Sequence, residues 1–281
     1  MSPTGTPAMQ ASDYRTIVVD SVAGVARVTL SRPEKRNAMN PRMHEEMAHA
    51  LPGLVADPAV RVIVITGAGS TFCAGADIKE YFRDLESRPD ERVRITELAR
   101  HWMWDVLAQA SKPTIAMVNG HCFGGGFLVS LACDIVVASE RAVFGLPEVN
   151  WGHLPGGAAS LKTIEAMGGR MALYYAMTGE NFDAATALRE RLVTRVVPHE
   201  QLHAQVEQLA ASLAAKSPVA LQAIKEIYRA APSVGMANIH DFVQAKVDQL
   251  RVRDTGGLRE RGMADFIAGK LRTTDAGGAS E

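Results

Sequence analysis

Two stretches of the chain repeat one order: a buried strand, a glycine-rich turn and the start of a helix. Residues 62–66 (VIVIT) lead into the turn at 74–77, and residues 114–118 (TIAMV) lead into the triple glycine at 124–126. Both strands are continuous apolar runs, which is typical of strands covered on both faces. Strands that alternate with helices in this way predict a layered α/β fold.

The rest of the sequence extends this pattern. Two β-branched runs at 16–20 and 25–30 predict a hairpin. Asn40 and Pro41 predict the N-cap and first residue of a helix that runs to about Val55. Further helices are predicted at 92–110 and from 125 to about 131, and short strands at 135–138, 143–144 and 192–197.

These elements predict repeated β–β–α turns followed by a helical C-terminal cap. Past Gly152 the sequence is almost entirely helical in pattern, with amphipathic helices at 202–213 and 219–228. We expect a disordered tail over residues 1–13, a core domain over 14–197 and a helical oligomerisation region over 198–281.

Composition narrows the class of protein. The 281 residues are 47% hydrophobic and 22% charged, which indicates a globular chain. The 30 Lys+Arg balance 31 Asp+Glu, so no basic excess favours nucleic acid. Three cysteines are too few for a disulfide framework or a zinc site. The first twelve residues lack the apolar segment of a signal peptide, and no run reaches the roughly 18 apolar residues of a membrane span. We therefore expect a cytoplasmic protein with no metal, membrane or nucleic-acid partner.

The two glycine turns suggest a chemistry. Helix starts expose backbone N–H groups, and small residues let a ligand approach them closely. Two such groups that converge on one point would form an oxyanion hole. The GxGxxG spacing of dinucleotide sites is absent, and no Gly-Lys-Ser/Thr follows as in a P-loop. A carbonyl-polarising role is therefore favoured over phosphate binding. The alternative is that the glycines serve only to turn the chain tightly.

Five stretches together carry a family resemblance. They are RPEKRNAM (32–39), CAGADIKEYF (73–82), KPTIAMVNGHCFGGGF (112–127), ACDIVVASERAVFGLPEVNWG (132–152) and LPGG (154–157). They resemble the crotonase, or enoyl-CoA hydratase/isomerase, superfamily, and the likeness runs from about Tyr14 to Arg272. Within it the chain is most similar to the hydroxycinnamoyl-CoA hydratase-lyases, which convert feruloyl- or 4-coumaroyl-CoA into an aromatic aldehyde and acetyl-CoA.

The resemblance implies a ββα superhelix with a helical C-terminal cap, an acyl-CoA thioester substrate and a homotrimer or homohexamer. No cofactor is expected, because coenzyme A is part of the substrate. The backbone N–H groups of Ala76 and Gly125 are implied to be the oxyanion donors. Glu148 is implied to be the acid/base carboxyl, although by itself it would be expected as a surface glutamate at a turn.

One position departs from the family's hydratases. Those enzymes hold a second glutamate two residues past the triple glycine, where this chain has Leu128. The hydratase-lyases also lack that glutamate and usually have serine there. Leu128 is therefore compatible with one-carboxylate chemistry, but it brings no hydroxyl that would position a water.

The resemblance also implies substrate contacts. Tyr81 matches a tyrosine that binds the phenolic oxygen, although in an amphipathic helix it would more often pack in the core. Gln244 falls where the lyases have a second phenol-binding tyrosine. Trp151 is expected in the core or in a pocket wall, and His153 is expected to be a loop residue.

Coenzyme A is expected along two loops. The implied contacts at positions 35–38 and 74–79 include three cations that would steer phosphates, unless they are ordinary solvated charges. Two residues of the last helix are implied to reach a neighbouring subunit's coenzyme A. The full set of implied contacts is Lys35, Arg36, Ala38, Ala74, Asp77, Ile78, Lys79, Phe266 and Lys270.

The sequence is compatible with three functions. A hydratase-lyase would use Glu148 and the oxyanion hole twice, for hydration and for retro-aldol cleavage. A second enzyme would stop at hydration or double-bond isomerisation. A non-catalytic binding protein of the same fold is disfavoured by the retention of Glu148 and of both glycine turns.

Overall fold

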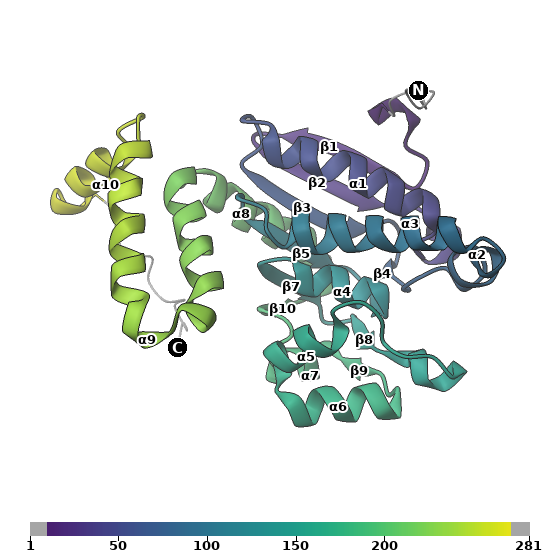
Figure 1. Cartoon of the computed structure of the whole chain (residues 1–281). Helices are drawn as coiled ribbons and strands as arrows, with labels where there is room; N and C mark the ends of the chain where they lie inside the picture. The colour runs from purple at the N-terminus through teal and green to yellow at the C-terminus, as the bar shows by residue number, and fades with distance from the viewer. Residues whose placement is uncertain (1–9, 271–281) are drawn as a thin grey trace, which may run out of the picture. The chain divides into compact units, whose positions relative to one another are not determined.

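The computed structural model describes residues 10–270 and separates into two compact units that meet after Ala214 (Figure 1). The first unit holds two sheets. The larger has six strands in the order β1-β2-β3-β5-β7-β10, namely Ile17–Val22, Val25–Leu30, Val62–Gly67, Thr114–Val118, Ile135–Ser139 and Arg195–Val197. The smaller has four strands in the order β4-β6-β8-β9, namely Thr71–Cys73, His121–Phe123, Val143–Gly145 and Phe182–Asp183.

The connectivity confirms the predicted β–β–α repeat. Each of the pairs β3/β4, β5/β6 and β7/β8 gives one strand to each sheet, and the strands of successive pairs lie parallel. Among the described strands, two pairs are antiparallel: β1/β2 at one end of the larger sheet and β8/β9 at one end of the smaller sheet. Because parallel strands need crossover connections, the chain advances by one repeat at a time, and the loops after β4 and β6 come to lie next to each other.

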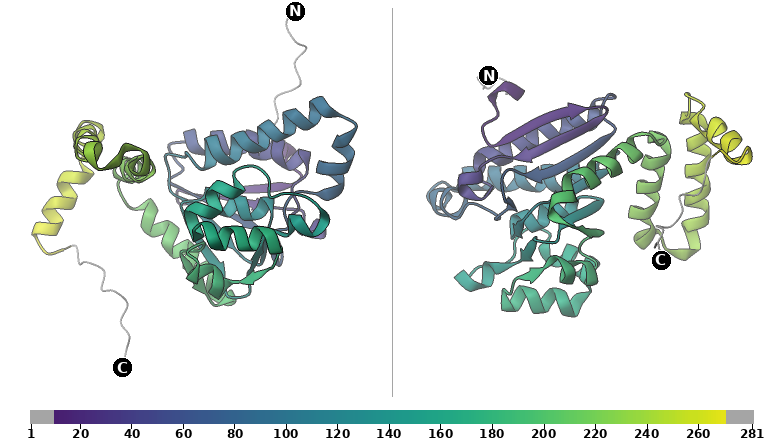
Figure 2. Two further views of the ribbon diagram at one scale, coloured as in Figure 1. Left: turned by 60° about the horizontal axis from the view of Figure 1, so that its bottom comes forward. Right: turned by 180° about the vertical axis from the view of Figure 1, so that it is seen from behind.

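The apolar run at 62–66 is explained by helices on both faces of the larger sheet. Val62 and Val64 pack with residues of α8 (Leu202–Ala214), whereas Ile63 and Ile65 belong to the core beneath α1 (Pro41–Ala56). Figure 1 shows α1 and α3 (Pro89–Arg100) on one face, and the rear view in Figure 2 shows α8 on the other. A strand covered on both sides is mostly apolar, and the hydroxyl of Thr66 near its end donates a hydrogen bond to the Met117 carbonyl at 2.9 Å.

The predicted helices of the first unit begin and end near the predicted residues, whereas the helix predicted at 219–228 runs from Pro218 to Arg253. The Asn40 side chain accepts a hydrogen bond from the Met43 N–H and caps α1, as predicted. The predicted helix at 92–110 is α3 followed by the wider π-helical η4 (His101–Leu107). The other helical segments of the first unit are η1 Ala11–Asp13, η2 Pro33–Lys35, η3 Ile78–Arg83, α2 Asp84–Glu86, α4 Gly125–Ala132, η5 Pro147–Trp151, α5 Ala159–Met167, α6 Gly169–Thr178, α7 Ala184–Arg189 and η6 His199–Gln201.

The boundary between the units lies after α8, whereas the sequence placed it at 197/198. The reason is that Leu202, Val206 and Ala210 of α8 are buried against the larger sheet. Strands β4, β6 and β9 were not predicted, because two or three residues are too few to show an alternating pattern.

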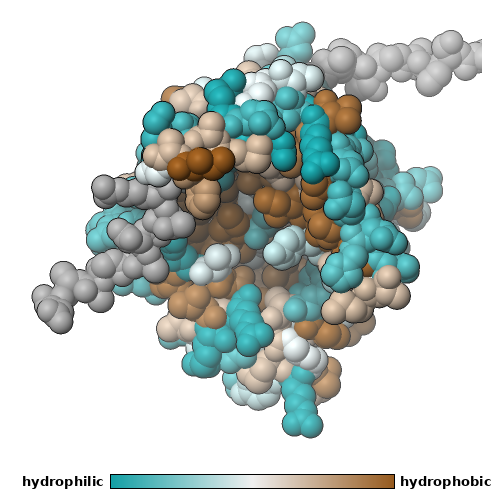
Figure 3. Space-filling view, turned by 90° about the vertical axis from the view of Figure 1, so that its left-hand side faces the viewer, coloured by the Kyte–Doolittle hydropathy of each residue, from teal (hydrophilic) through white to brown (hydrophobic). Residues whose placement is uncertain are grey.

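The second unit consists of α9 (Pro218–Arg253) and α10 (Leu258–Ile267). Gly235 takes a non-helical conformation that divides α9 into two arms, which lie side by side (Figure 2) and are joined by a Lys246–Glu226 ion pair. Neither helix has a buried residue, and Met236, Val252 and Ile267 are more than four-fifths exposed. The space-filling view in Figure 3 shows such brown hydrophobic side chains among teal hydrophilic ones. Between residues 10 and 270 no helix is long and apolar enough to cross a membrane.

Candidate active site

The turn at 74–77 is held against the loop that precedes α1. Met39 pairs with Ala76 in a parallel bridge, in which the Met39 N–H donates to the Gly75 carbonyl and the Asp77 N–H to the Met39 carbonyl, both at 2.8 Å. The Ala74 N–H donates to the Arg36 carbonyl at 3.0 Å. These bonds use the N–H groups of Ala74 and Asp77, and the Gly75 N–H lies 3.4 Å from Cys73 Sγ, but the N–H of Ala76 itself is not used. Its N–H is left available to a ligand.

The second turn supplies another available N–H group. Gly124 has φ +49°, a conformation that favours glycine, and its N–H donates to the Gly145 carbonyl at 3.1 Å. Gly125 is the first residue of α4, so its N–H has no partner within the helix. The partial positive charge of a helix N-terminus adds to its attraction for a developing oxyanion.

The fold brings these two N–H groups together. A Cβ atom built on Gly125 would lie 3.6 Å from the Ala76 nitrogen, and one built on Gly75 would lie 3.4 Å from the Gly125 nitrogen. In the described part of the chain neither nitrogen donates to another protein group. The two turns therefore present adjacent donors, as an oxyanion hole requires.

Glu148 lies directly against the second turn. It belongs to η5, which follows β8, and its Oε1 atom would lie 2.7 Å from a Cβ built on Gly124. Only a glycine at 124 leaves room for this carboxyl. The Oε2 atom is buried and has no hydrogen-bond partner among the described residues. Burial raises the pKa of Glu148, although its own backbone and His153 oppose the shift. Glu148 is therefore not a solvated surface residue but a partly buried carboxyl that retains its proton to higher pH than an exposed glutamate does.

Leu128 forms an apolar wall one turn further along α4. Its side chain is 7% exposed and belongs to the main hydrophobic core. A Cβ built on Gly157 would lie 3.6 Å from Leu128 Cδ1 and 4.0 Å from Trp104 Nε1. This side chain can neither orient a water nor carry a proton, so Glu148 is the titratable side chain in contact with the second turn.

Tyr81 is packed on one side and polar at its tip. Its ring lies 5.3 Å from the ring of His44, and its hydroxyl lies 3.2 Å from Thr96 Oγ1. His44 is buried and its Nδ1 accepts a hydrogen bond from Trp102 Nε1 at 3.1 Å. Burial lowers the pKa of His44 to about 4, so it is a neutral acceptor at pH 7. No sequence motif points to His44, because an isolated histidine in a helix has no local pattern.

Trp151 lies in an aromatic cluster with two neighbours. Its ring centroid is 5.4 Å from that of Phe82 and 4.9 Å from that of His153, and Phe82 and His153 are also 4.9 Å apart. Trp151 is 42% exposed, so the core alternative for this residue is wrong. Its use as a pocket wall stays a prediction.

Some of the residues implied to bind coenzyme A are exposed, and others already form an ion pair or a hydrogen bond within the protein. Lys35, Arg36 and Ile78 are exposed, and Arg36 lines a polar cavity of about 610 Å³ between the 33–36 loop and residues 68–71. The Lys79 ammonium already pairs with Asp84 at 2.8 Å. Ala38 is half-buried, and its carbonyl accepts a hydrogen bond from Arg32 at 2.7 Å.

The Asp77 side chain is buried, and both of its carboxylate oxygens have partners within the protein. It caps η3 by accepting hydrogen bonds from the N–H groups of Lys79 and Glu80. Its carboxylate is therefore not available to coenzyme A, and only its main chain borders the turn.

Three implied residues lie in the second unit. Gln244 in α9 donates to Asp248 at 3.1 Å, Phe266 in α10 is 63% exposed, and Lys270 lies 3.6 Å from Asp265. Their roles toward substrate stay predictions.

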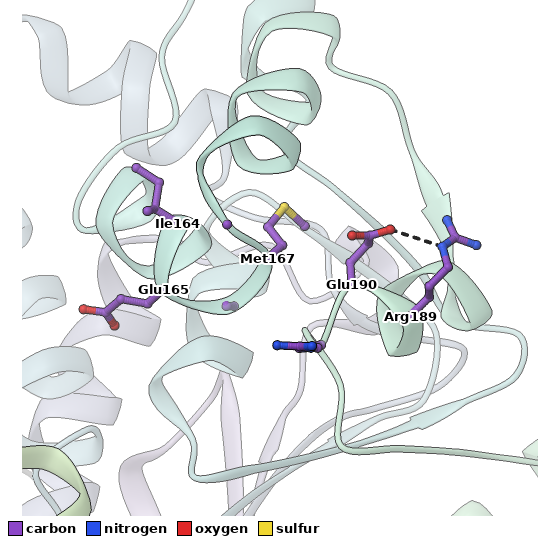
Figure 4. A pocket seen from close by; sticks show the side chains of 8 residues that line it. Ile164, Glu165, Met167, Arg189 and Glu190 are labelled. Atoms are coloured by element: carbon purple, nitrogen blue, oxygen red, sulfur yellow. Dashed lines mark hydrogen bonds and ion pairs between the residues drawn. The ribbon is translucent and has the colours of Figure 1, made fainter. Parts of the chain in front are cut away.

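A second cavity, of about 420 Å³, contains none of the predicted site residues. Figure 4 shows that Ile164, Glu165 and Met167 line one side of it and the Arg189–Glu190 ion pair the other. No cluster of three or more His, Cys, Asp or Glu able to hold a metal ion occurs in the range 10–270.

Comparisons with known proteins identify the family of this chain. The family model described as enoyl-CoA hydratase/isomerase matches residues 20–262. A hydroxycinnamoyl-CoA hydratase-lyase from Pseudomonas fluorescens is 43% identical over 92% of this chain and 94% of its own length. A 2,3-dehydroadipyl-CoA hydratase from Escherichia coli is 35% identical over 78% of this chain and 84% of its own. The crystal structure of an enoyl-CoA hydratase from Bacillus anthracis, 28% identical, matches with a TM-score of 0.83 over 91% of this chain and 97% of its own.

The fold and the paired N–H groups define a crotonase-type enzyme that acts on acyl-CoA thioesters. The chain belongs to the enoyl-CoA hydratase/isomerase family.

Proposed function

We propose that this enzyme hydrates the double bond of a hydroxycinnamoyl-CoA, of the feruloyl or 4-coumaroyl type, and cleaves the adduct to an aromatic aldehyde and acetyl-CoA. The observation that carries the proposal is the position of the Glu148 carboxyl against Gly124, next to the Ala76 and Gly125 nitrogens. This arrangement puts one proton-transfer group beside one pair of oxyanion donors. The similarity to the Pseudomonas fluorescens hydratase-lyase supports the choice of substrate class.

In the first half-reaction the thioester oxygen accepts hydrogen bonds from Ala76 and Gly125. Glu148 takes a proton from a water whose oxygen bonds to the β-carbon, and the electrons of the double bond move to the thioester as an enolate. The two donors stabilise that charge, and protonated Glu148 returns the proton to the α-carbon. A single carboxyl is sufficient, because the proton that it removes is the one that it gives back.

In the second half-reaction Glu148 removes the proton of the β-hydroxyl group. The carbon–oxygen bond becomes the aldehyde carbonyl, the bond between the α- and β-carbons breaks, and its electrons form the enolate of acetyl-CoA. The same pair of N–H groups stabilises this enolate until Glu148 protonates it. One oxyanion hole thus serves both steps, with about 2.7–4 kcal/mol expected from each donor.

Substrate selection is assigned to the aromatic side chains. Tyr81 would bind the phenolic oxygen, because its hydroxyl is the polar end of an otherwise packed ring. Phe82 and Trp151 would stack against the aryl group, since edge and face contacts between rings are favourable. Lys35 and Arg36 would attract the phosphates of coenzyme A from exposed positions.

A second candidate function is hydration without cleavage. Leu128 favours it, because this position contributes no hydroxyl to hold water or the β-hydroxyl group. Incubation with feruloyl-, 4-coumaroyl-, cinnamoyl- and crotonyl-CoA, followed by mass detection of products, separates the two. Aldehyde and acetyl-CoA in equal amounts support the hydratase-lyase, whereas a 3-hydroxyacyl-CoA that accumulates without aldehyde refutes cleavage.

We also propose that the enzyme is a homotrimer or a dimer of trimers. The support is the absence of any buried residue in α9 and α10 together with their exposed apolar side chains. Light scattering coupled to size-exclusion chromatography measures the mass directly. A monomer at micromolar concentration would contradict the proposal.

A further inference from the structure

The buried guanidinium of Arg32 joins three parts of the site. Arg32 is 8% exposed, and its Nη1 atom lies 3.0 Å from Asp77 Oδ2 and 2.7 Å from the Ala38 carbonyl. Its Nη2 atom lies 2.6 Å from Glu80 Oε1. All three acceptors flank or follow the turn that carries Ala76. A planar guanidinium can satisfy them together, because its N–H groups point in fixed directions.

The two carboxylates are held from their other sides as well. Asp77 Oδ1 accepts from the N–H groups of Lys79 and Glu80, and Glu80 Oε2 accepts from Asn40 Nδ2 at 2.6 Å. Burial acts to raise the pKa of Asp77, but the hydrogen bonds from Glu80 and Arg32 lower it overall, so it is ionised at neutral pH. Removal of Arg32 would leave a buried carboxylate without its counter-charge.

We propose that Arg32 is a positioning residue for the oxyanion donor Ala76. The peptide that carries the Ala76 N–H lies between Gly75, whose φ of +97° is a conformation that favours glycine, and Asp77, which Arg32 holds. On the Gly75 side the Met39 N–H donates to the Gly75 carbonyl at 2.8 Å, and the Cys73 thiol lies 3.8 Å from the same oxygen. Without Arg32, the Asp77 side of the turn would keep the bond from its N–H to the Met39 carbonyl and the bonds from Lys79 and Glu80 to its carboxylate. The buried carboxylate would lose its counter-charge, however, and its shift toward solvent would turn the adjoining peptide and misdirect the Ala76 N–H. This inference rests on the oxyanion role of Ala76 in the proposed function.

The test uses acetoacetyl-CoA, whose enolate absorbs in the near ultraviolet and needs no turnover. In Arg32→Met the equilibrium constant for enolisation of the bound ligand is expected to fall at least tenfold. The kcat for hydration of the enoyl-CoA double bond is expected to fall by up to about 100-fold, which is the effect of a misplacement of a catalytic group by about 1 Å. Arg42→Met is the matched control, because Arg42 bonds the buried Glu46 and the Asp13 carbonyl and none of the three acceptors of Arg32. It is expected to lower Tm without a change in enolisation or kcat.

The outcomes separate the two proposals. If Arg32→Met loses stability but keeps the wild-type enolisation constant and kcat, the positioning role is refuted. If Arg32→Met does not fold, Arg32→Lys decides, because a single ammonium cannot bond all three acceptors in the same way. Wild-type values in Arg32→Lys would then refute the role. If the wild-type enzyme itself does not favour the enolate, the oxyanion hole fails, and with it the proposed function.

Discussion

Gly125→Ala tests the space in which the thioester oxygen is proposed to bind. The added methyl group would lie 3.6 Å from the Ala76 nitrogen and 2.5 Å from Met39 Cε. An oxygen that accepts a hydrogen bond from Ala76 must lie about 2.9 Å from that nitrogen. The methyl group would therefore compete with the oxygen for the same region.

The effect on stability is expected to be small. The close atom is the terminal methyl group of a flexible methionine, which can move, at a cost of about 1–3 kcal/mol for a tight insertion. Replacement of glycine by alanine in a helix returns about 0.5–1 kcal/mol. The net loss of about 0–2.5 kcal/mol predicts a decrease in Tm of at most about 10 °C, at about 2–4 °C per kcal/mol.

The effect on catalysis is expected to be much larger. Loss of one oxyanion donor costs about 2.7–4 kcal/mol, so kcat should fall about 100- to 1000-fold while the Kd for free coenzyme A stays unchanged. The assay is hydration of an enoyl-CoA followed by the loss of its conjugated absorbance. Gly53→Ala is the control, because Gly53 is in α1 and a Cβ there would have no neighbour within 4 Å. A folded Gly125→Ala enzyme with kcat within threefold of wild type would refute the assignment of the oxyanion hole.

Three further changes test the other parts of the site. Glu148→Gln should lower kcat by about 10²–10⁴-fold. Because burial raises the pKa of Glu148, the folded state disfavours its ionised form, so the glutamine variant should also have a higher Tm at pH 7–8; a lower Tm there would contradict the burial argument. The wild-type kcat should decrease as pH falls through this raised pKa, and a kcat that stays constant down to the ordinary glutamate pKa would count against the base role. Tyr81→Phe should reduce kcat/KM for 4-coumaroyl-CoA more than for cinnamoyl-CoA, and equal losses on both would exclude phenol recognition. Leu128→Ser should lower stability by about 2–4 kcal/mol, because the side chain is buried, while hydration activity per folded molecule is unchanged or higher; a loss of that activity would show that Leu128 shapes the pocket.

Much of the site was predictable because its chemistry lies in short segments. The turns at 74–77 and 124–126 and Pro147–Glu148 each keep their residues within a few positions, and steric and hydrogen-bond preferences act over that range. The Asn40 cap of α1 is another local feature, and the structure shows it as predicted. Family resemblance supplied the roles, which the residues alone left open.

Other features depended on segments far apart in the chain. The Arg32–Asp77 ion pair, the His44–Trp102 hydrogen bond and the burial of Glu148 Oε2 each need two or more repeats packed together. A sequence pattern gives no distance between such residues.

The sequence by itself determined which peptides can carry free N–H groups, because glycine conformation and helix starts are set by adjacent residues. Only the tertiary structure decided that the groups of Ala76 and Gly125 lie side by side with Glu148 next to them. The pairing of β4 with β6 places the two turns next to each other, and β8, paired with β6, brings η5 to the same edge. Proximity and burial are properties of packed strands and helices, so the raised pKa of Glu148 arises only when the chain is folded.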